Sequence, residues 1–124
     1  MKQKNLLRKK YLLLRKKKYF EVNKLFFNPI IKLIKSKFRN KKIKIGLYFP
    51  SFFELNVLKI LELKYISDQK LFLPIIEENN TMNFFPWKKN EILFVNKYGI
   101  LEPRKTSIGK PNIILVPLLV FDKS

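Results

Sequence analysis

KIGLYFPSFFELNVLKILELKY, residues 44–65, is the stretch of sequence that decides the fold. Its first part has the two-residue period of a β-strand, because apolar side chains recur at alternate positions: Ile43, Ile45, Leu47 and Phe49. Pro50 cannot donate a ladder hydrogen bond, so the strand should end there. The stretch therefore predicts a short buried strand, a tight loop and then a helix.

Glu54 raises the main functional question. Ser51 can cap the expected helix, and Glu54 follows it at the spacing of a capping box. In open α/β sheets, however, ligands bind just beyond the carboxyl ends of the strands, which is where we expect Glu54 to lie. The residues alone leave both interpretations open: a ligand contact, or only the completion of a cap.

Outward from this stretch, the pattern predicts helices before it and further strands after it. The apolar spacing indicates a basic helix over residues 2–20 and a second helix that begins at Asn28-Pro29. The order of strand, helix and buried strand predicts a single α/β domain over residues 1–124, built on a parallel sheet. The remaining expectations are a second buried strand at Leu71–Pro74, an extended segment at Thr81–Trp87, a strand or short helix at Glu91–Asn96, a loop at Gly99–Thr106 and a third buried strand at Asn112–Val116.

The composition excludes several kinds of chemistry. The chain has no Cys and no His, which removes disulfides, thiolate nucleophiles, imidazole bases and the usual zinc sites. No glycine-rich phosphate loop is present either, since Gly46, Gly99 and Gly109 lie too far apart to form one. A catalytic role would therefore depend on carboxylates, cations and backbone groups.

Positive charge is concentrated in the N-terminal third. The formal net charge is +18, and residues 1–44 hold 17 of the 27 Lys and Arg residues against the single acid Glu21. Such a field attracts nucleic acid, an anionic surface or a phosphate-rich ligand. A second explanation is compositional drift in an AT-biased genome, which would also account for the many lysines, the four arginines and the absence of alanine.

Two features that the sequence lacks bear on the binding partners and the cellular compartment of the protein. Aromatic residues are not interleaved with the basic run in an RNA-binding pattern, so we do not expect nucleic acid to be the main partner. The longest apolar run, Ile113–Phe121, is far shorter than the roughly 20 residues that span a bilayer. We therefore expect a cytoplasmic protein with no membrane partner.

Six short motifs in order resemble the 5-formyltetrahydrofolate cyclo-ligases, also called methenyltetrahydrofolate synthetases. The resemblance implies a Rossmann-like, three-layer α/β domain that uses ATP and Mg²⁺ to convert 5-formyltetrahydrofolate to 5,10-methenyltetrahydrofolate. The motifs are Lys4-x-x-Leu7-Arg8 with Arg15, Tyr48-x-Pro50 followed by Glu54, Lys70 with Leu73-Pro74, Met82-x-Phe84, Tyr98-Gly99-Ile100-x-Glu102-Pro103, and Val116-Pro117 with Phe121-Asp122.

The resemblance also implies roles for individual residues. Lys4 and Arg8 would contact the phosphates of ATP, Phe49 and Glu54 would contact the folate, and an aromatic ring at Tyr98 would lie beside the pterin. Lys4 and Arg8 have suitable chemistry, since a helical i, i+4 pair places two cations on one face. The residues alone also allow a solvated basic helix and an ordinary loop tyrosine.

The sequence departs from the family pattern near its end. The family continues past Phe-Asp into a glycine-rich loop whose amides and Arg hold phosphate and whose final Asp helps to hold Mg²⁺, whereas the sequence given ends at Ser124. Asn112 stands where an Asp is usual, Val57 where a Thr is usual and Leu118 where a Gly is usual. We therefore expect a fold that is incomplete at its C-terminus, without the magnesium residue, and little or no cyclo-ligase activity in the 124-residue chain.

Overall fold

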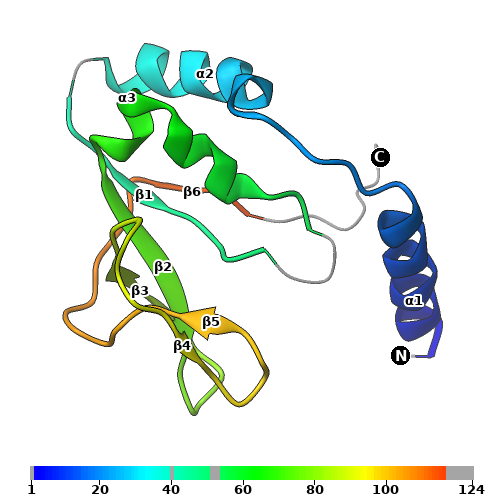
Figure 1. Ribbon diagram of the computed structural model, residues 1–124. Coiled ribbons are helices and arrows are strands. Elements are labelled where there is room, and N and C mark those ends of the chain that lie inside the picture. Colours follow the sequence, from blue (N-terminus) through cyan, green and yellow to red (C-terminus); the bar gives the residue numbers. More distant parts are fainter. Residues whose placement is uncertain (1, 40, 51–53, 117–124) are drawn as a thin grey trace.

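The structure, a computed structural model, describes residues 2–39, 41–50 and 54–116 (Figure 1). Helices occupy most of the first half of the chain, and five of the six described strands lie in the second half. In chain order the elements are α1 (Lys2–Lys17), the 3₁₀-helix η1 (Lys24–Phe27), α2 (Asn28–Phe38), β1 (Lys44–Gly46), the 3₁₀-helix η2 (Val57–Glu62), α3 (Lys64–Ser67), β2 (Lys70–Ile76), β3 (Met82–Pro86), β4 (Phe94–Val95), β5 (Leu101–Glu102) and β6 (Ile113–Ile114).

A four-stranded sheet in the order β3-β2-β1-β6 forms the centre of the fold. β1 pairs in parallel with both neighbours, so that Ile45 lies opposite Leu71 of β2 and Ile113 of β6. β3 is antiparallel to β2, with Phe85 opposite Leu73. The sheet is thus mostly parallel, and the predicted α/β class is confirmed.

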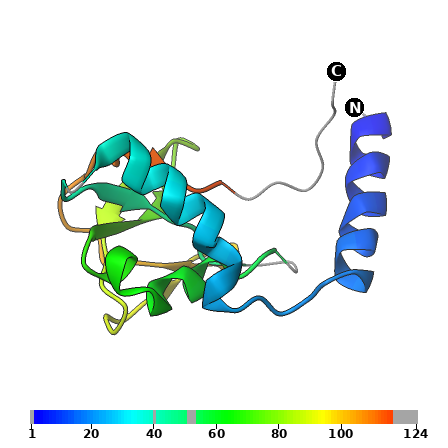
Figure 2. The same ribbon diagram turned by 90° about the horizontal axis from the view of Figure 1, so that it is seen from above.

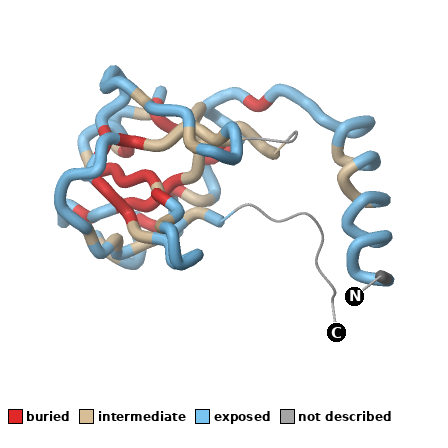
Figure 3. Tube along the Cα trace, turned by 90° about the horizontal axis from the view of Figure 1, so that it is seen from below, coloured by how far each residue is buried: buried red, intermediate tan, exposed pale blue. Residues whose placement is uncertain are grey.

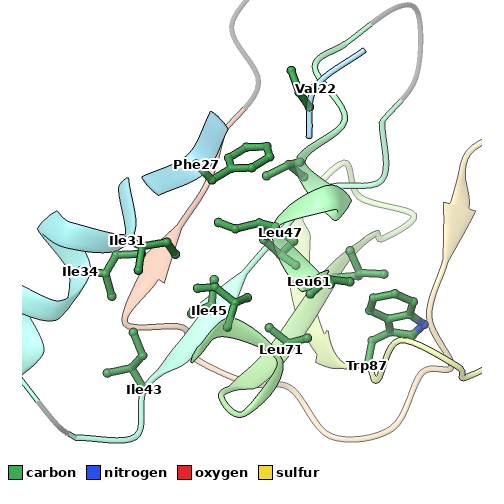
Figure 4. Packing of buried hydrophobic residues seen from close by; sticks show 14 residues of the cluster. Val22, Phe27, Ile31, Ile34, Ile43, Ile45, Leu47, Leu61, Leu71 and Trp87 are labelled. Carbon is green, nitrogen blue, oxygen red and sulfur yellow. The ribbon is translucent and has the colours of Figure 1, made fainter. Parts of the chain in front are cut away.

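One hydrophobic core joins the helices to one face of the sheet (Figure 4). The alternation predicted for β1 is observed, since Ile43, Ile45 and Leu47 are all buried. Side chains of α2 pack against them, which confirms the apolar face expected after Asn28-Pro29. The other buried members of this core are Val22, Phe27, Ile31, Ile34, Val57, Ile60, Leu61, Ile66, Leu71, Leu73 and Trp87.

The helix expected directly after Ser51 is wrong in its starting point. The described helical segment is η2, which begins at Val57, and Ser51 itself lies outside the described residues. The side chain of Asn56 determines this start, because its Oδ1 accepts the N–H of Leu58 at 3.2 Å. Glu54 therefore precedes the described helix instead of lying in its first turn.

A two-stranded hairpin, β4 with β5, follows the main sheet. It resolves the choice left open for Glu91–Asn96 in favour of a strand, and it shows that Gly99–Thr106 is not wholly a loop. Gly99 has φ +76°, a value that glycine adopts without steric cost, at the tight turn between the strands. Glu102 fixes the hairpin to the sheet, because its Oε2 accepts the N–H of Ile76 at 2.9 Å.

β6 corrects the expectation of a third fully buried strand. It lies at one end of the described sheet with β1 as its neighbour, and Ile114 is 46% exposed. Asn112 begins the pairing, since its Oδ1 accepts the N–H of Lys44 at 2.8 Å and its own N–H donates to the carbonyl of Lys44. The continuous apolar pattern of this segment is typical of a central strand, but the observed strand is only partly covered.

α1 stands apart from the body of the fold. It ends at Lys17, three residues before the predicted end, and lies beyond the carboxyl ends of β1 and β6 (Figures 1 and 2). Most of its side chains are exposed (Figure 3), and the half-buried ones are Tyr11, Leu12 and Arg15. None of the described helices combines the length and apolar character needed to cross a bilayer.

Candidate functional site

The segment that follows β1 forms a constrained loop at the carboxyl end of the strand. The backbone N–H of Leu47 donates to the carbonyl of Phe72 at 2.9 Å, which carries the β1–β2 pairing one residue past β1. Beyond it, Tyr48 and Phe49 are half-buried. The hydroxyl of Tyr48 donates to the carbonyl of Leu55 at 2.8 Å and so ties the outgoing chain to the chain that returns toward η2.

The surroundings of Tyr48 show which charged groups lie near this loop. Burial, together with the negative charge of Glu54, raises the pKa of the Tyr48 hydroxyl to about 12, while the positive charge of Arg15 acts in the opposite direction. An anionic and a cationic side chain therefore both lie within electrostatic range of the same phenol. Since Arg15 belongs to α1, the charge of that helix acts on the loop at this point.

Phe49 and Glu54, the predicted folate contacts, lie on the two sides of this loop. Both are half-buried, Phe49 directly after Tyr48 and Glu54 directly before Leu55. A half-buried carboxylate beside an aromatic ring can accept N–H groups from a flat heterocycle that packs on the ring. The structure thus places these two predicted residues on one loop at the expected edge of the sheet.

Lys4 and Arg8, the predicted ATP contacts, lie exposed on α1. They precede Arg15 by 11 and 7 residues, which are close to three and two turns of an α-helix. The three cations therefore share one side of α1, and the charge of Arg15 acts on Tyr48 in the loop. Three cations along one side of a helix suit a chain of phosphate groups.

Tyr98 lies apart from these residues, in the turn between β4 and β5. It is 53% exposed, and the Nζ of Lys97 lies 5.2 Å from the centre of its ring. Asn96 shapes the turn, because its Oδ1 accepts the N–H of Tyr98 at 2.8 Å and that of Ile100 at 3.0 Å. Tyr98 thus belongs to the local structure of its hairpin.

The described residues were also searched for metal ligands and other cavities. Across residues 2–39, 41–50 and 54–116, no three acidic side chains gather closely enough to hold a metal ion. A groove of about 900 Å³ lies at the opposite, amino-terminal edge of β1 and β2. It contains the first residues of both strands, Lys44 and Lys70, but none of the five predicted site residues lines it.

Comparison with known proteins gives a likeness to solved structures. No family model matches the sequence, and no curated protein matches it. Among solved structures, the chain is similar to the NMR structure of 5,10-methenyltetrahydrofolate synthetase from Aquifex aeolicus, with a TM-score of 0.63 and 25% sequence identity. The likeness covers 96% of this chain and 62% of the other, so the chain spans less than two thirds of the length of that protein.

This likeness agrees with the fold predicted from the sequence motifs, and it favours the same enzyme family. Two residues of the site were not among the predicted contacts, namely Arg15 and Tyr48. Both stand in the motifs that suggested the family: Arg15 in the first, and Tyr48 in the Tyr48-x-Pro50 step. Their spacing within those motifs was the signal that could have identified them.

Proposed function

We propose that this chain is a folate-binding protein of the 5-formyltetrahydrofolate cyclo-ligase family. The observation that carries the proposal is the placement of Glu54 and Phe49 on one loop at the carboxyl end of β1, in a fold similar to that of a methenyltetrahydrofolate synthetase. The carboxylate of Glu54 would accept N–H groups of the pterin, and the ring of Phe49 would pack against it. This arrangement suits 5-formyltetrahydrofolate as the ligand.

The second substrate in this proposal is ATP. Lys4 and Arg8 would bind its phosphates from the side of α1 that also carries Arg15, which would bring the phosphates toward the folate. ATP would supply the phosphoryl group that activates the formyl oxygen. In this reaction the protein contributes placement and charge stabilisation, which is chemistry open to a chain without His or Cys. Mg²⁺ would accompany the nucleotide, but the described residues form no acidic cluster that would hold it, so we assign it no ligand.

Calorimetric titration of the 124-residue chain with 5-formyltetrahydrofolate tests the proposal. We expect saturable binding that Glu54→Gln weakens about tenfold or more, because the substitution removes the charge from the hydrogen-bond acceptor. Glu62→Gln is the matched control: it removes the same charge from η2, where Glu62 is exposed and faces Lys59. If the wild-type chain shows no saturable binding, or if both variants lose affinity equally, the proposal fails.

Turnover is measured separately, through the absorbance of methenyltetrahydrofolate formed in the presence of ATP and Mg²⁺. The sequence predicts little or no signal from this chain. ATP-dependent formation well above the blank would contradict that prediction and would strengthen the family proposal. Folate binding without turnover would agree with both the folate-binding proposal and the prediction of little activity.

The exposed basic helix favours a second candidate function, a non-enzymatic module that binds nucleic acid or another anionic surface. α1 carries eight Lys and Arg residues and no acid, and most of its surface is open to solvent (Figure 3). Titration with tRNA at low and at physiological salt separates the candidates, since non-specific phosphate contacts weaken steeply as salt rises. Tight binding that survives physiological salt, without folate binding, would support the module.

A further inference from the structure

Arg15 is the only arginine of α1 that is half-buried, and one of its nitrogen atoms lacks an acceptor. Its Nε is buried, with no hydrogen-bond partner in the structure. A buried N–H without an acceptor is costly in free energy, so most such groups in folded proteins are paired with protein, water or ligand. The guanidinium has a planar set of donors that matches carboxylate and phosphate oxygens. Arg15 is therefore suited to an anionic group that arrives with a ligand.

The position of Arg15 relates it to the residues proposed to bind substrates. Its charge and that of Glu54 both act on the hydroxyl of Tyr48, so Arg15 lies within electrostatic range of the loop that follows β1. Tyr48 itself is held by its hydrogen bond to the carbonyl of Leu55. Figures 1 and 2 show α1 at the carboxyl ends of β1 and β6, the edge where ligands bind in open α/β sheets.

The spacing along α1 places Arg15 in a row with the predicted phosphate contacts. Lys4, Arg8, Tyr11 and Arg15 follow one another at intervals of four, three and four residues, which keeps them on one side of an α-helix. Tyr11 is half-buried, like Arg15. The row therefore begins at two exposed cations and ends at a half-buried one.

We infer that Arg15 binds an anionic oxygen of a ligand held between α1 and the loop that follows β1. The inference rests on the proposed function for the identity of that ligand. Two oxyanions are then available, a phosphate of ATP and the glutamate carboxylate of the folate. A phosphate and a carboxylate both accept hydrogen bonds from a guanidinium in a similar geometry, so the experiment has to distinguish the two.

The test compares Arg15→Gln with Lys17→Gln in the full 124-residue chain. Lys17 is exposed and two residues further along α1, so it loses the same charge from the opposite side of the helix. The probes are inorganic tripolyphosphate, 5-formyltetrahydrofolate, and the same pterin compound without its glutamate. We expect Arg15→Gln to weaken either tripolyphosphate or 5-formyltetrahydrofolate about tenfold or more, and Lys17→Gln to change each less than about twofold.

The pattern across the probes identifies the oxyanion. Lost affinity for tripolyphosphate assigns Arg15 to phosphate, whereas lost affinity for the intact folate but not for the glutamate-free compound assigns it to the carboxylate. Arg15→Lys keeps the positive charge but loses the planar set of N–H donors of the guanidinium. We therefore expect it to recover only part of the affinity. Circular-dichroism melting of each variant confirms that it is folded before it is titrated.

The two proposals fail in different ways. If the wild-type chain binds 5-formyltetrahydrofolate and Arg15→Gln binds every probe as tightly as wild type, the role of Arg15 is overturned and the proposed function stands. If the wild-type chain binds only tripolyphosphate and loses it with Arg15→Gln, the oxyanion site stands and the folate proposal falls. If Arg15→Gln and Lys17→Gln lose affinity equally, the effect comes from net charge alone and the inference is overturned.

Discussion

Replacing Tyr48 by Phe should change how the stability of this protein depends on pH. The Tyr48 hydroxyl has a pKa near 12 in the folded chain, against an ordinary value of 10.0, chiefly because it is buried and secondly because Glu54 is near. A raised pKa means that folding favours the protonated phenol. Its contribution to stability is therefore complete below about pH 10 and is lost as the pH rises toward 12.

The magnitude follows from these two pKa values. At about pH 11 the linkage amounts to roughly 1.4 kcal/mol if the full shift acts. Solvent screening of a half-buried group reduces this to roughly 1 kcal/mol. At about pH 8 the linkage is absent, and the variant loses only the hydrogen bond to the Leu55 carbonyl, which costs about 1 kcal/mol. We expect wild type to be more stable than Tyr48→Phe by about 1 kcal/mol at pH 8, with the difference close to zero at pH 11.

Urea unfolding of both proteins at the two pH values measures this change. Contributions of all other ionisable groups are common to both proteins and cancel in the difference between wild type and variant. A difference in unfolding free energy that stays constant between pH 8 and pH 11 would refute the environment assigned to Tyr48. A difference that grows with pH would refute the sign of the argument.

Three further substitutions test the scaffold. Gly109→Ala should lower the unfolding free energy by about 1–3 kcal/mol in urea titration, because the added Cβ would lie 2.1 Å from the ring of Phe72; a neutral result would contradict this packing. Asn112→Ala should lower the unfolding free energy by about 1 kcal/mol, because it removes the acceptor of the Lys44 N–H. Asn112→Asp should retain most of the stability, since a carboxylate can still accept that N–H. Equal shifts in melting temperature for the two variants would count against this hydrogen bond. Asn56→Ala should cost about 1 kcal/mol by removing the cap of η2, and an unchanged melting temperature would disprove that role.

Local patterns predicted the centre of the fold well. The alternation of Ile43, Ile45 and Leu47 was sufficient to find β1 and the face it buries, because in a strand the side-chain period alone decides which residues point inward. Leu71–Pro74 likewise lies within β2, and its first two residues pair in parallel with β1. Both correct predictions concern neighbouring strands whose apolar side chains are buried.

The errors arise where tertiary context decides the outcome. The apolar run at Asn112–Val116 predicts a buried strand, but burial depends on which elements cover it, and the sequence pattern does not contain that information. The start of η2 was misplaced because both Ser51 and Asn56 are good caps, and sequence alone does not rank them. The segment of β4 was left open between strand and helix, and that of β5 was predicted to be a loop, because two-residue strands are too short to show a period.

The candidate site could be predicted only in part, for the same reason. Glu54 was found because a carboxylate just after a strand lies at the functional edge of an α/β sheet. Arg15 comes from an element more than 30 positions away in the sequence, and no periodicity links it to Tyr48. Tyr98 was suggested by a motif, but the structure places it in a hairpin turn with its own contacts, so its role beside the pterin stays a prediction.

The departures from the family pattern at Asn112 and Val57 concern the scaffold. Asn112 uses its side-chain oxygen to accept the N–H of Lys44, which an Asp would also do, so the β1–β6 pairing does not need the charge. Val57 is 3% exposed in the hydrophobic core, where a methyl group in place of the usual hydroxyl leaves no polar atom to satisfy. Neither substitution alters the loop that holds Phe49 and Glu54. Changes at these two positions are therefore compatible with a retained folate site, and whether that site is retained depends on Glu54, Phe49 and the side of α1 that carries Arg15.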